Sequence, residues 1–109
     1  MATKLDELLE ILDELIQLLE SDGEQHWSKW IRQSRSQLLK SDYSGIELLL
    51  SAYGGMGSFN DLVISQSYEN GQFHWKEGHI DKNNRLSELR SKAWELADAI
   101  RRNHIISDS

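Results

Sequence analysis

Glycines cluster near the middle of the chain, in the string Tyr53–Leu62, which is Tyr-Gly-Gly-Met-Gly-Ser-Phe-Asn-Asp-Leu. Glycine adopts positive φ and has no Cβ, so it occurs where the backbone turns sharply or where another group approaches it closely. Successive backbone amides in such a turn can bind an anion, and Asp61 beside a histidine can exchange protons with a substrate. One hypothesis is therefore a small enzyme or ligand-binding domain that uses the Gly54–Asp61 turn.

The glycine string does not match the known phosphate-binding loops. A phosphate loop needs Lys and then Ser or Thr after its last glycine, whereas Ser58 and Phe59 follow Gly57. A dinucleotide-binding loop needs a preceding strand and a wider glycine spacing. The other hypothesis, which we favour, is a structural helix-to-strand turn whose polar side chains bond to backbone amides. Its residues are Gly54, Gly55, Gly57, Ser58, Asn60 and Asp61.

Histidines and carboxylates elsewhere in the chain are candidates for metal ligands or catalytic groups. His74, His79 and Asp81 are the best candidates, with His26 and Glu24 as outside contributors. Their spacing matches no zinc pattern, and the chain has no cysteine. No nucleophile elbow or Ser-His-Asp order is present. The sequence therefore predicts no catalytic residue, no metal and no cofactor, and places the histidines on a solvated hairpin.

The net charge of −6 is concentrated at one end of the chain. Residues 1–24 carry eight acids and one base, whereas residues 25–109 carry ten acids and eleven bases. The clustered basic surface of a nucleic-acid-binding protein is absent, so we expect no nucleic-acid partner. Local negative charge attracts a basic protein, although it is also typical of a solvated helix face. The predicted partner-binding acids are Glu7, Glu10, Asp13 and Glu14.

Length and composition indicate one domain, residues 1–109, with a single core. The first apolar segment is interrupted by acids, so it does not resemble a signal peptide. No apolar run approaches the length of about 18 residues that a membrane span needs. Together with the lack of cysteine, these observations predict a cytoplasmic protein with no membrane partner.

Hydrophobic periodicity predicts the helices. Apolar residues from Leu5 to Leu19 recur at steps of three and four, which indicates an amphipathic helix over 4–21. A second helix is expected over 24–40 and a short apolar one over 44–53, with the first and last helices flanking the short one. The last helix is expected to begin after a loop over 78–83, at a cap on Asn83 or Asn84, and to end before Asn103.

Asn70-Gly71 separates two β-prone runs, 62–68 and 72–76, and is the strongest short-range signal for a hairpin. The fold class predicted is mainly α, with about four helices around one core and a small β-hairpin (62–76) between the third and last helices. Aromatic residues on such a hairpin can anchor a protein partner. We therefore add Tyr68, Asn70 and Trp75 to the predicted partner-binding residues.

The segment from Ile46 to Ile64, with the glycine string at its centre, resembles the core of a family of small bacterial proteins. The helix beginning at Leu86 resembles that family's C-terminal part, and the resemblance covers residues 27–100. Members of the family are similar, as a class, to the small acidic immunity proteins that accompany secreted bacterial toxins. The resemblance implies a cognate toxin as the partner, and the acidic first helix predicts that this toxin has a basic surface.

The leading functional hypothesis is accordingly a non-catalytic immunity protein that neutralises a toxin domain by occlusion and electrostatic complementarity. The enzyme or ligand-binding hypothesis at the Gly54–Asp61 turn stays open beside it. A third hypothesis is an oligomerisation module that uses the broad apolar stripe of the first helix. The oligomeric state is not determined by the sequence.

Overall fold

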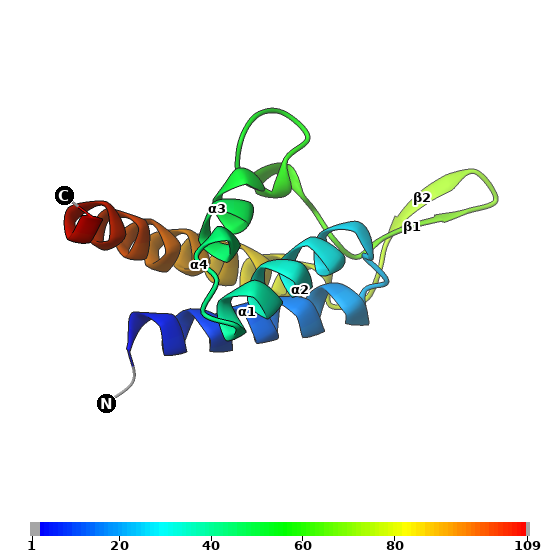
Figure 1. Cartoon of the computed structure of the whole chain (residues 1–109). Helices are drawn as coiled ribbons and strands as arrows, with labels where there is room; N and C mark the ends of the chain where they lie inside the picture. Colours follow the sequence, from blue (N-terminus) through cyan, green and yellow to red (C-terminus); the bar gives the residue numbers. More distant parts are fainter. Residues whose placement is uncertain (1–2, 109) are drawn as a thin grey trace.

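The computed structural model describes the backbone of residues 3–108 and the side chains of residues 3–104. Four helices enclose the core: α1 (Lys4–Ser21), α2 (His26–Leu39), α3 (Ser44–Ser51) and α4 (His79–Asp108). Between α3 and α4 lie the 3₁₀ turn η1 (Phe59–Asp61) and the hairpin strands β1 (Gln66–Glu69) and β2 (Gln72–Trp75). The predicted fold class is confirmed: the protein is mainly α with one small hairpin between the third and last helices (Figure 1).

Helix α1 packs between α2 and α4 and runs antiparallel to α4 (Figure 1). Thr3 caps its first turn: the Thr3 side chain accepts a hydrogen bond from the Asp6 amide, and the Asp6 carboxylate accepts one from the Thr3 amide. The apolar stripe that predicted this helix is its buried face, formed by Leu8, Leu12, Leu15, Ile16 and Leu19. Because α2 and α4 cover this stripe, it is not the free surface that the oligomerisation hypothesis requires.

Helix α3 packs mainly on α2 and also on α4. The expectation that α1 and α4 flank α3 is therefore wrong, because α2 occupies the position next to α3 that was assigned to α1. A small residue allows this close packing: a Cβ on Gly45 would lie 2.7 Å from the Ser34 carbonyl oxygen and 2.8 Å from Leu38 Cγ.

No helix in the described residues is long and apolar enough to cross a bilayer.

The hairpin extends away from the helices as a free-standing ribbon (Figure 1). Asn70 and Gly71 form its two-residue loop with φ values of 52° and 78°, as the Asn-Gly signal predicted. The register pairs Gln66 with Trp75, Ser67 with His74, Tyr68 with Phe73 and Glu69 with Gln72. The first strand is shorter than predicted, because Leu62–Ile64 is extended but unpaired with β2.

Helix α4 begins at His79, directly after Gly78, and continues to Asp108. Three predictions for this helix are therefore wrong: the loop over 78–83, the cap at Asn83 or Asn84, and the end before Asn103. The chain contains no glycine or proline from residue 79 to residue 108, so nothing in its composition interrupts the helix. Asn83 lies in the first turns of α4, where its side chain bonds to Ile64 instead of capping the helix.

The contact at Gly45 gives a stability prediction. Gly45→Ala should lower the free energy of unfolding by about 1–3 kcal/mol, because the new methyl group forces α3 away from α2. Gly54→Ala is the matched control, since its Cβ would meet nothing within 4 Å. Urea unfolding followed by tryptophan fluorescence measures both. Equal stability of the two variants would contradict the close packing of α2 and α3 described above.

Candidate functional site

One face of the hairpin carries a continuous row of rings, which we call the aromatic face: Tyr68, Phe73, Trp75 and His79. Residues opposite each other in an antiparallel pair point to the same side, so the register places Tyr68 and Phe73 together, with Trp75 beside them. Tyr68 meets Phe73 edge to face at 5.5 Å between ring centroids, and Phe73 meets Trp75 at 5.0 Å. Trp75 stacks on His79, the first residue of α4, at 4.8 Å.

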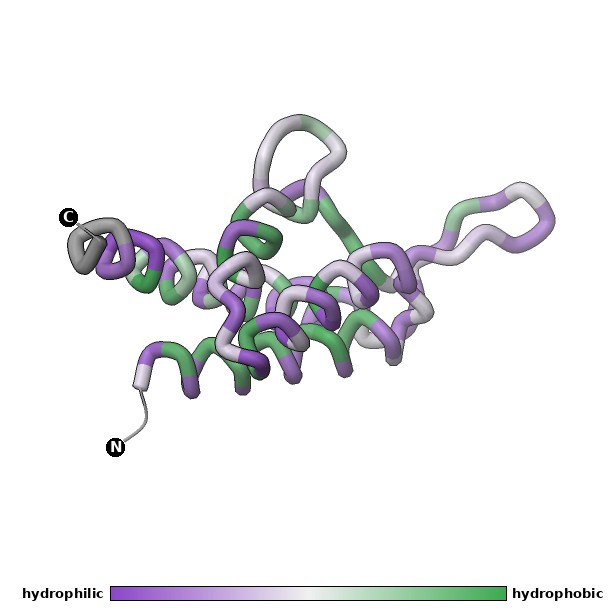
Figure 2. The backbone as a smooth tube through the Cα atoms, viewed as in Figure 1, coloured by the Kyte–Doolittle hydropathy of each residue, from purple (hydrophilic) through white to green (hydrophobic). Residues whose placement is uncertain are grey.

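The aromatic face is exposed to solvent. Tyr68 is 73% exposed and Trp75 47% exposed, and Val63 and Ile80, which are also exposed, lie next to it. A shallow hollow lies at the base of the hairpin, and its lining includes Leu62, Val63, Trp75, His79 and Ile80. Figure 2 shows the hydrophobic segment that leads from the glycine turn to this base. Exposed apolar side chains gathered in this way are typical of protein interaction sites.

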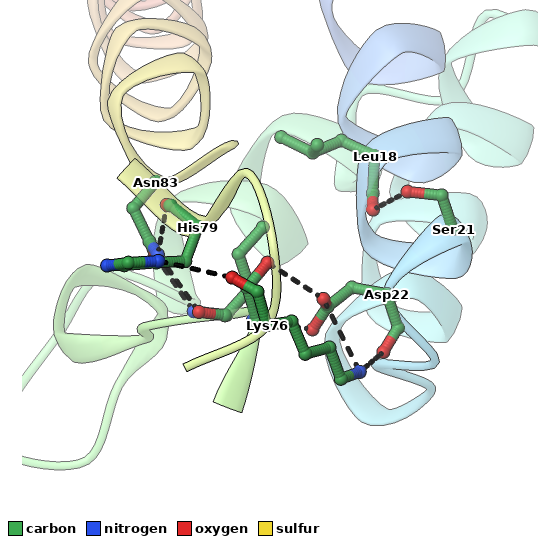
Figure 3. A network of polar contacts seen from close by, with 8 residues as sticks. Leu18, Ser21, Asp22, Lys76, His79 and Asn83 are labelled. Carbon is green, nitrogen blue, oxygen red and sulfur yellow. Dashed lines mark hydrogen bonds and ion pairs between the residues drawn. The ribbon is translucent and has the colours of Figure 1, made fainter. Parts of the chain in front are cut away.

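The base of the hairpin is fixed to the end of α1 by Asp22 (Figure 3). The Ser65 amide and hydroxyl donate to the two Asp22 carboxylate oxygens at 2.9 and 3.0 Å. Lys76 Nζ lies 3.7 Å from the same carboxylate and donates to the Asp22 carbonyl oxygen, and the Lys76 amide donates to the Ser65 carbonyl oxygen. Ser65 is buried and has a φ of 65°, so this network holds a residue in the left-handed region.

A second contact fixes the hairpin base to α4. The Asn83 side chain accepts a hydrogen bond from the Ile64 amide and donates to the Ile64 carbonyl oxygen, both at 2.9 Å (Figure 3). Asn83 thus supplies both bonds that a neighbouring strand would otherwise provide to the buried Ile64. Asp22 and Asn83 together set the direction in which the aromatic face leaves the body of the protein.

The glycine turn bonds to itself. Gly55 and Gly57 have positive φ, and the Gly57 amide donates to the Asp61 carboxylate at 2.8 Å. Ser58 accepts a hydrogen bond from the Asn60 amide, and the Asn60 side chain donates to the Tyr53 carbonyl oxygen. The hollow beside Gly57 and Asp61 has no histidine among its described lining residues. The side chains of Ser58, Asn60 and Asp61 are therefore engaged within the turn.

Arg90 of α4 holds the segment that follows the turn. Its guanidinium donates to the carbonyl oxygens of Phe59 and Leu62 at 2.8 and 3.1 Å, and burial lowers its pKa. The Tyr53 hydroxyl donates to the Arg90 carbonyl oxygen, and burial raises the pKa of Tyr53. Phe59 is fully buried against the rings of Trp27 and Tyr53. These contacts fix the end of the turn in the core.

The acids of α1 lie apart from the aromatic face. Glu7, Glu10 and Asp13 are in the first two-thirds of α1, and the hairpin projects from beyond the other end of that helix (Figure 1). Glu14 forms an ion pair with Arg85 of α4, and Glu20 forms one with Arg32 of α2. The structure thus divides the predicted partner-binding residues into two groups, and one member of the acidic group, Glu14, bridges two helices.

The histidines do not converge. No group of three or more His, Asp or Glu side chains in the described part of the chain has a geometry that could hold a metal ion. His79 stacks on Trp75, whereas His74 points to the opposite face of the hairpin. His26 lies edge to face against Trp27, and Glu24 accepts a hydrogen bond from the Trp27 amide at the start of α2.

Sequence reasoning found Tyr68 and Trp75 but missed Phe73, Val63 and Ile80. Phe73 could be predicted from the sequence, because the Asn-Gly loop fixes the register and so places Phe73 opposite Tyr68. Ile80 was missed because its segment was predicted to be loop. Exposed carboxylates also lie near the hairpin, on Glu69, Glu77 and Asp81, whereas the sequence placed the partner-binding acids on the first helix alone.

Residues 20–73 match a family model described as a domain of unknown function, DUF6966. The match is just under half of the chain and runs from the end of α1 into β2, so it includes Asp22, the glycine turn and most of the hairpin. No curated protein and no solved structure matches the chain.

The Asp22 network gives a second stability prediction. Asp22→Asn should lower the free energy of unfolding by about 1–3 kcal/mol, because one Ser65 donor loses its acceptor. The Ser65 amide should also exchange with solvent faster, which NMR hydrogen exchange measures. Glu10→Gln removes the same charge from an exposed position of α1 and serves as the control. Unchanged stability together with unchanged Ser65 exchange would show that Asp22 does not fix the hairpin.

Proposed function

We propose that this protein is a non-catalytic immunity protein, which neutralises a cognate bacterial toxin domain by occlusion and electrostatic complementarity. It acts in the cytoplasm, its partner presents a basic surface, and it uses no nucleic acid and no cofactor. The aromatic face is the anchoring contact, and the carboxylates around it and on α1 attract the partner.

The observation that carries this proposal is the exposure of Tyr68, Phe73 and Trp75 on a hairpin that projects from the core. Buried tyrosine and tryptophan side chains dominate the binding energy of protein interfaces. The Asp22 and Asn83 contacts fix the base of this hairpin before binding. The direction in which the hairpin projects is therefore set in advance, which lowers the conformational entropy lost on association.

The charge distribution supports a basic partner. Glu69, Glu77 and Asp81 are exposed on and next to the hairpin, and Glu7 and Glu10 are exposed on α1. At about 0.15 M salt, charges act over about 8 Å, so the acids near the hairpin dominate. At about 0.01 M salt the range is about 30 Å, and the acids of α1 contribute to the attraction as well.

The proposal is tested with the product of the reading frame next to this gene. Co-expression should protect cells from that product if it is a toxin, and the two purified proteins should form a 1:1 complex by calorimetry. Trp75→Ala should raise Kd by at least about tenfold, because an interface anchor is lost. Trp94→Ala is the matched control, since Trp94 is 42% exposed and lies on α4 away from the hairpin.

Two results would contradict the proposal. The first is growth inhibition that this protein does not relieve, with no complex detected. The second is a complex whose Kd changes equally in Trp75→Ala and Trp94→Ala. A catalytic function would instead appear as chemical modification of the partner by a substoichiometric amount of this protein.

The acids of α1 give a separate prediction. The double variant Glu7→Lys/Glu10→Lys should lower the association rate several-fold at about 0.01 M salt and flatten its salt dependence, with little change in the dissociation rate. The control variant Glu47→Lys/Glu95→Lys changes the net charge equally, at exposed positions of α3 and α4. Glu14 is left unchanged because it pairs with Arg85. Equal association rates for the two variants would show that the acids of α1 do not contribute to the attraction of the partner.

A further inference from the structure

The two strands of the hairpin have open edges. β1 and β2 pair with each other, and neither strand packs along a described helix. Three of the four residues of β1 and all four of β2 are exposed. A two-stranded hairpin is marginally stable by itself in water, and a third strand supplies the missing hydrogen bonds and apolar cover.

The register determines which backbone groups face outward. The Lys76 amide donates to the Ser65 carbonyl oxygen, so Ser65 and Lys76 are opposite each other at a hydrogen-bonded position. Such positions alternate along an antiparallel pair, so Ser67 with His74 is bonded, whereas Gln66 with Trp75 and Tyr68 with Phe73 are not. The N–H and C=O groups of Phe73 and Trp75 therefore point away from β1, along the open edge of β2.

This open edge is complementary to itself. If a second copy is placed antiparallel with a two-fold axis through His74, Phe73 of each copy lies opposite Trp75 of the other. Both residues carry outward backbone groups, so each Phe73–Trp75 pair exchanges its N–H···O bonds. Both side chains lie on the aromatic face, and aromatic pairs opposite each other stabilise a sheet.

The charges are also compatible with this arrangement. Gln72 of one copy lies opposite Lys76 of the other, on the face that Glu69 shares with Gln72. Across the sheet, Glu69 therefore lies next to Gln72 of the same copy, and Gln72 lies next to Lys76 of the second copy. No two like charges are opposite each other. The equivalent pairing through β1 would place Gln66 opposite Tyr68 and would form no aromatic pair.

We propose that two copies of this protein associate through the β2 edges of their hairpins, forming a four-stranded antiparallel sheet around a two-fold axis at His74. The sheet joins the two aromatic faces into one larger surface and leaves that surface open. The contact uses the strand edge, so it does not depend on the immunity function.

Opposite-charge variants at His74 test this arrangement, because the two His74 side chains would face each other across the axis. The His74 side chain is exposed and points away from the aromatic face, so its replacement does not alter Tyr68, Phe73 or Trp75. Wild-type protein should sediment as a concentration-dependent dimer in analytical ultracentrifugation. His74→Lys and His74→Glu should each raise the dimer Kd on the order of tenfold by like-charge repulsion.

An equimolar mixture of the two variants should restore dimer formation, which a loss of folding could not explain. Ser67→Lys is the control: Ser67 is on the same face but one strand further from the axis, and its replacement should leave the dimer intact. A wild-type protein that is monomeric at all concentrations would overturn the proposal. A mixture that dimerises no better than either variant would overturn it too. Neither result affects the co-expression test, which reports on the toxin partner alone.

Discussion

The buried backbone of Ile64 is the constraint on which the arrangement of the hairpin depends. Ile64 enters the core without a strand beside it, and its amide and carbonyl groups would be unsatisfied if the Asn83 side chain did not bond to both. The amide and hydroxyl of the next residue, Ser65, both donate to the Asp22 carboxylate. Two side chains therefore satisfy backbone groups that a third strand would otherwise bond to, and the hairpin beyond them contacts α4 through the stacking of Trp75 on His79.

This constraint separates two groups of aromatic residues on either side of the anchor. Trp27, Tyr53 and Phe59 pack around the end of the glycine turn, where Phe59 is fully buried and Arg90 holds its carbonyl oxygen. Tyr68, Phe73 and Trp75 lie beyond the anchor and are exposed. The first group stabilises the fold, because the burial of large aromatic side chains is strongly favourable. The second group contributes nothing comparable to the core, which is the reason for the proposal that it contacts a partner.

Much of the fold was predictable because its signals are local. The periodicity from Leu5 to Leu19 predicted α1 with its observed bounds, and the Asn70-Gly71 dipeptide predicted the hairpin. The start of α4 was missed because asparagine is a common cap, and its use at position 83 as a bridge to Ile64 depends on a residue 19 positions earlier. The site was only partly predictable: Trp75 was identified, whereas Ile80 and Val63 join it through contacts between separate segments.

The sequence by itself determined the first three helices, the two-residue hairpin loop and the concentration of acids in the first helix, because each follows from residues that are neighbours along the chain. Only the tertiary structure decided that Asp22 fixes the hairpin across 43 positions, and that Glu14 is paired with Arg85. It also decided that the acids of α1 and the aromatic face lie far apart. These features depend on how the helices pack, and packing is set by contacts between residues that are distant in sequence.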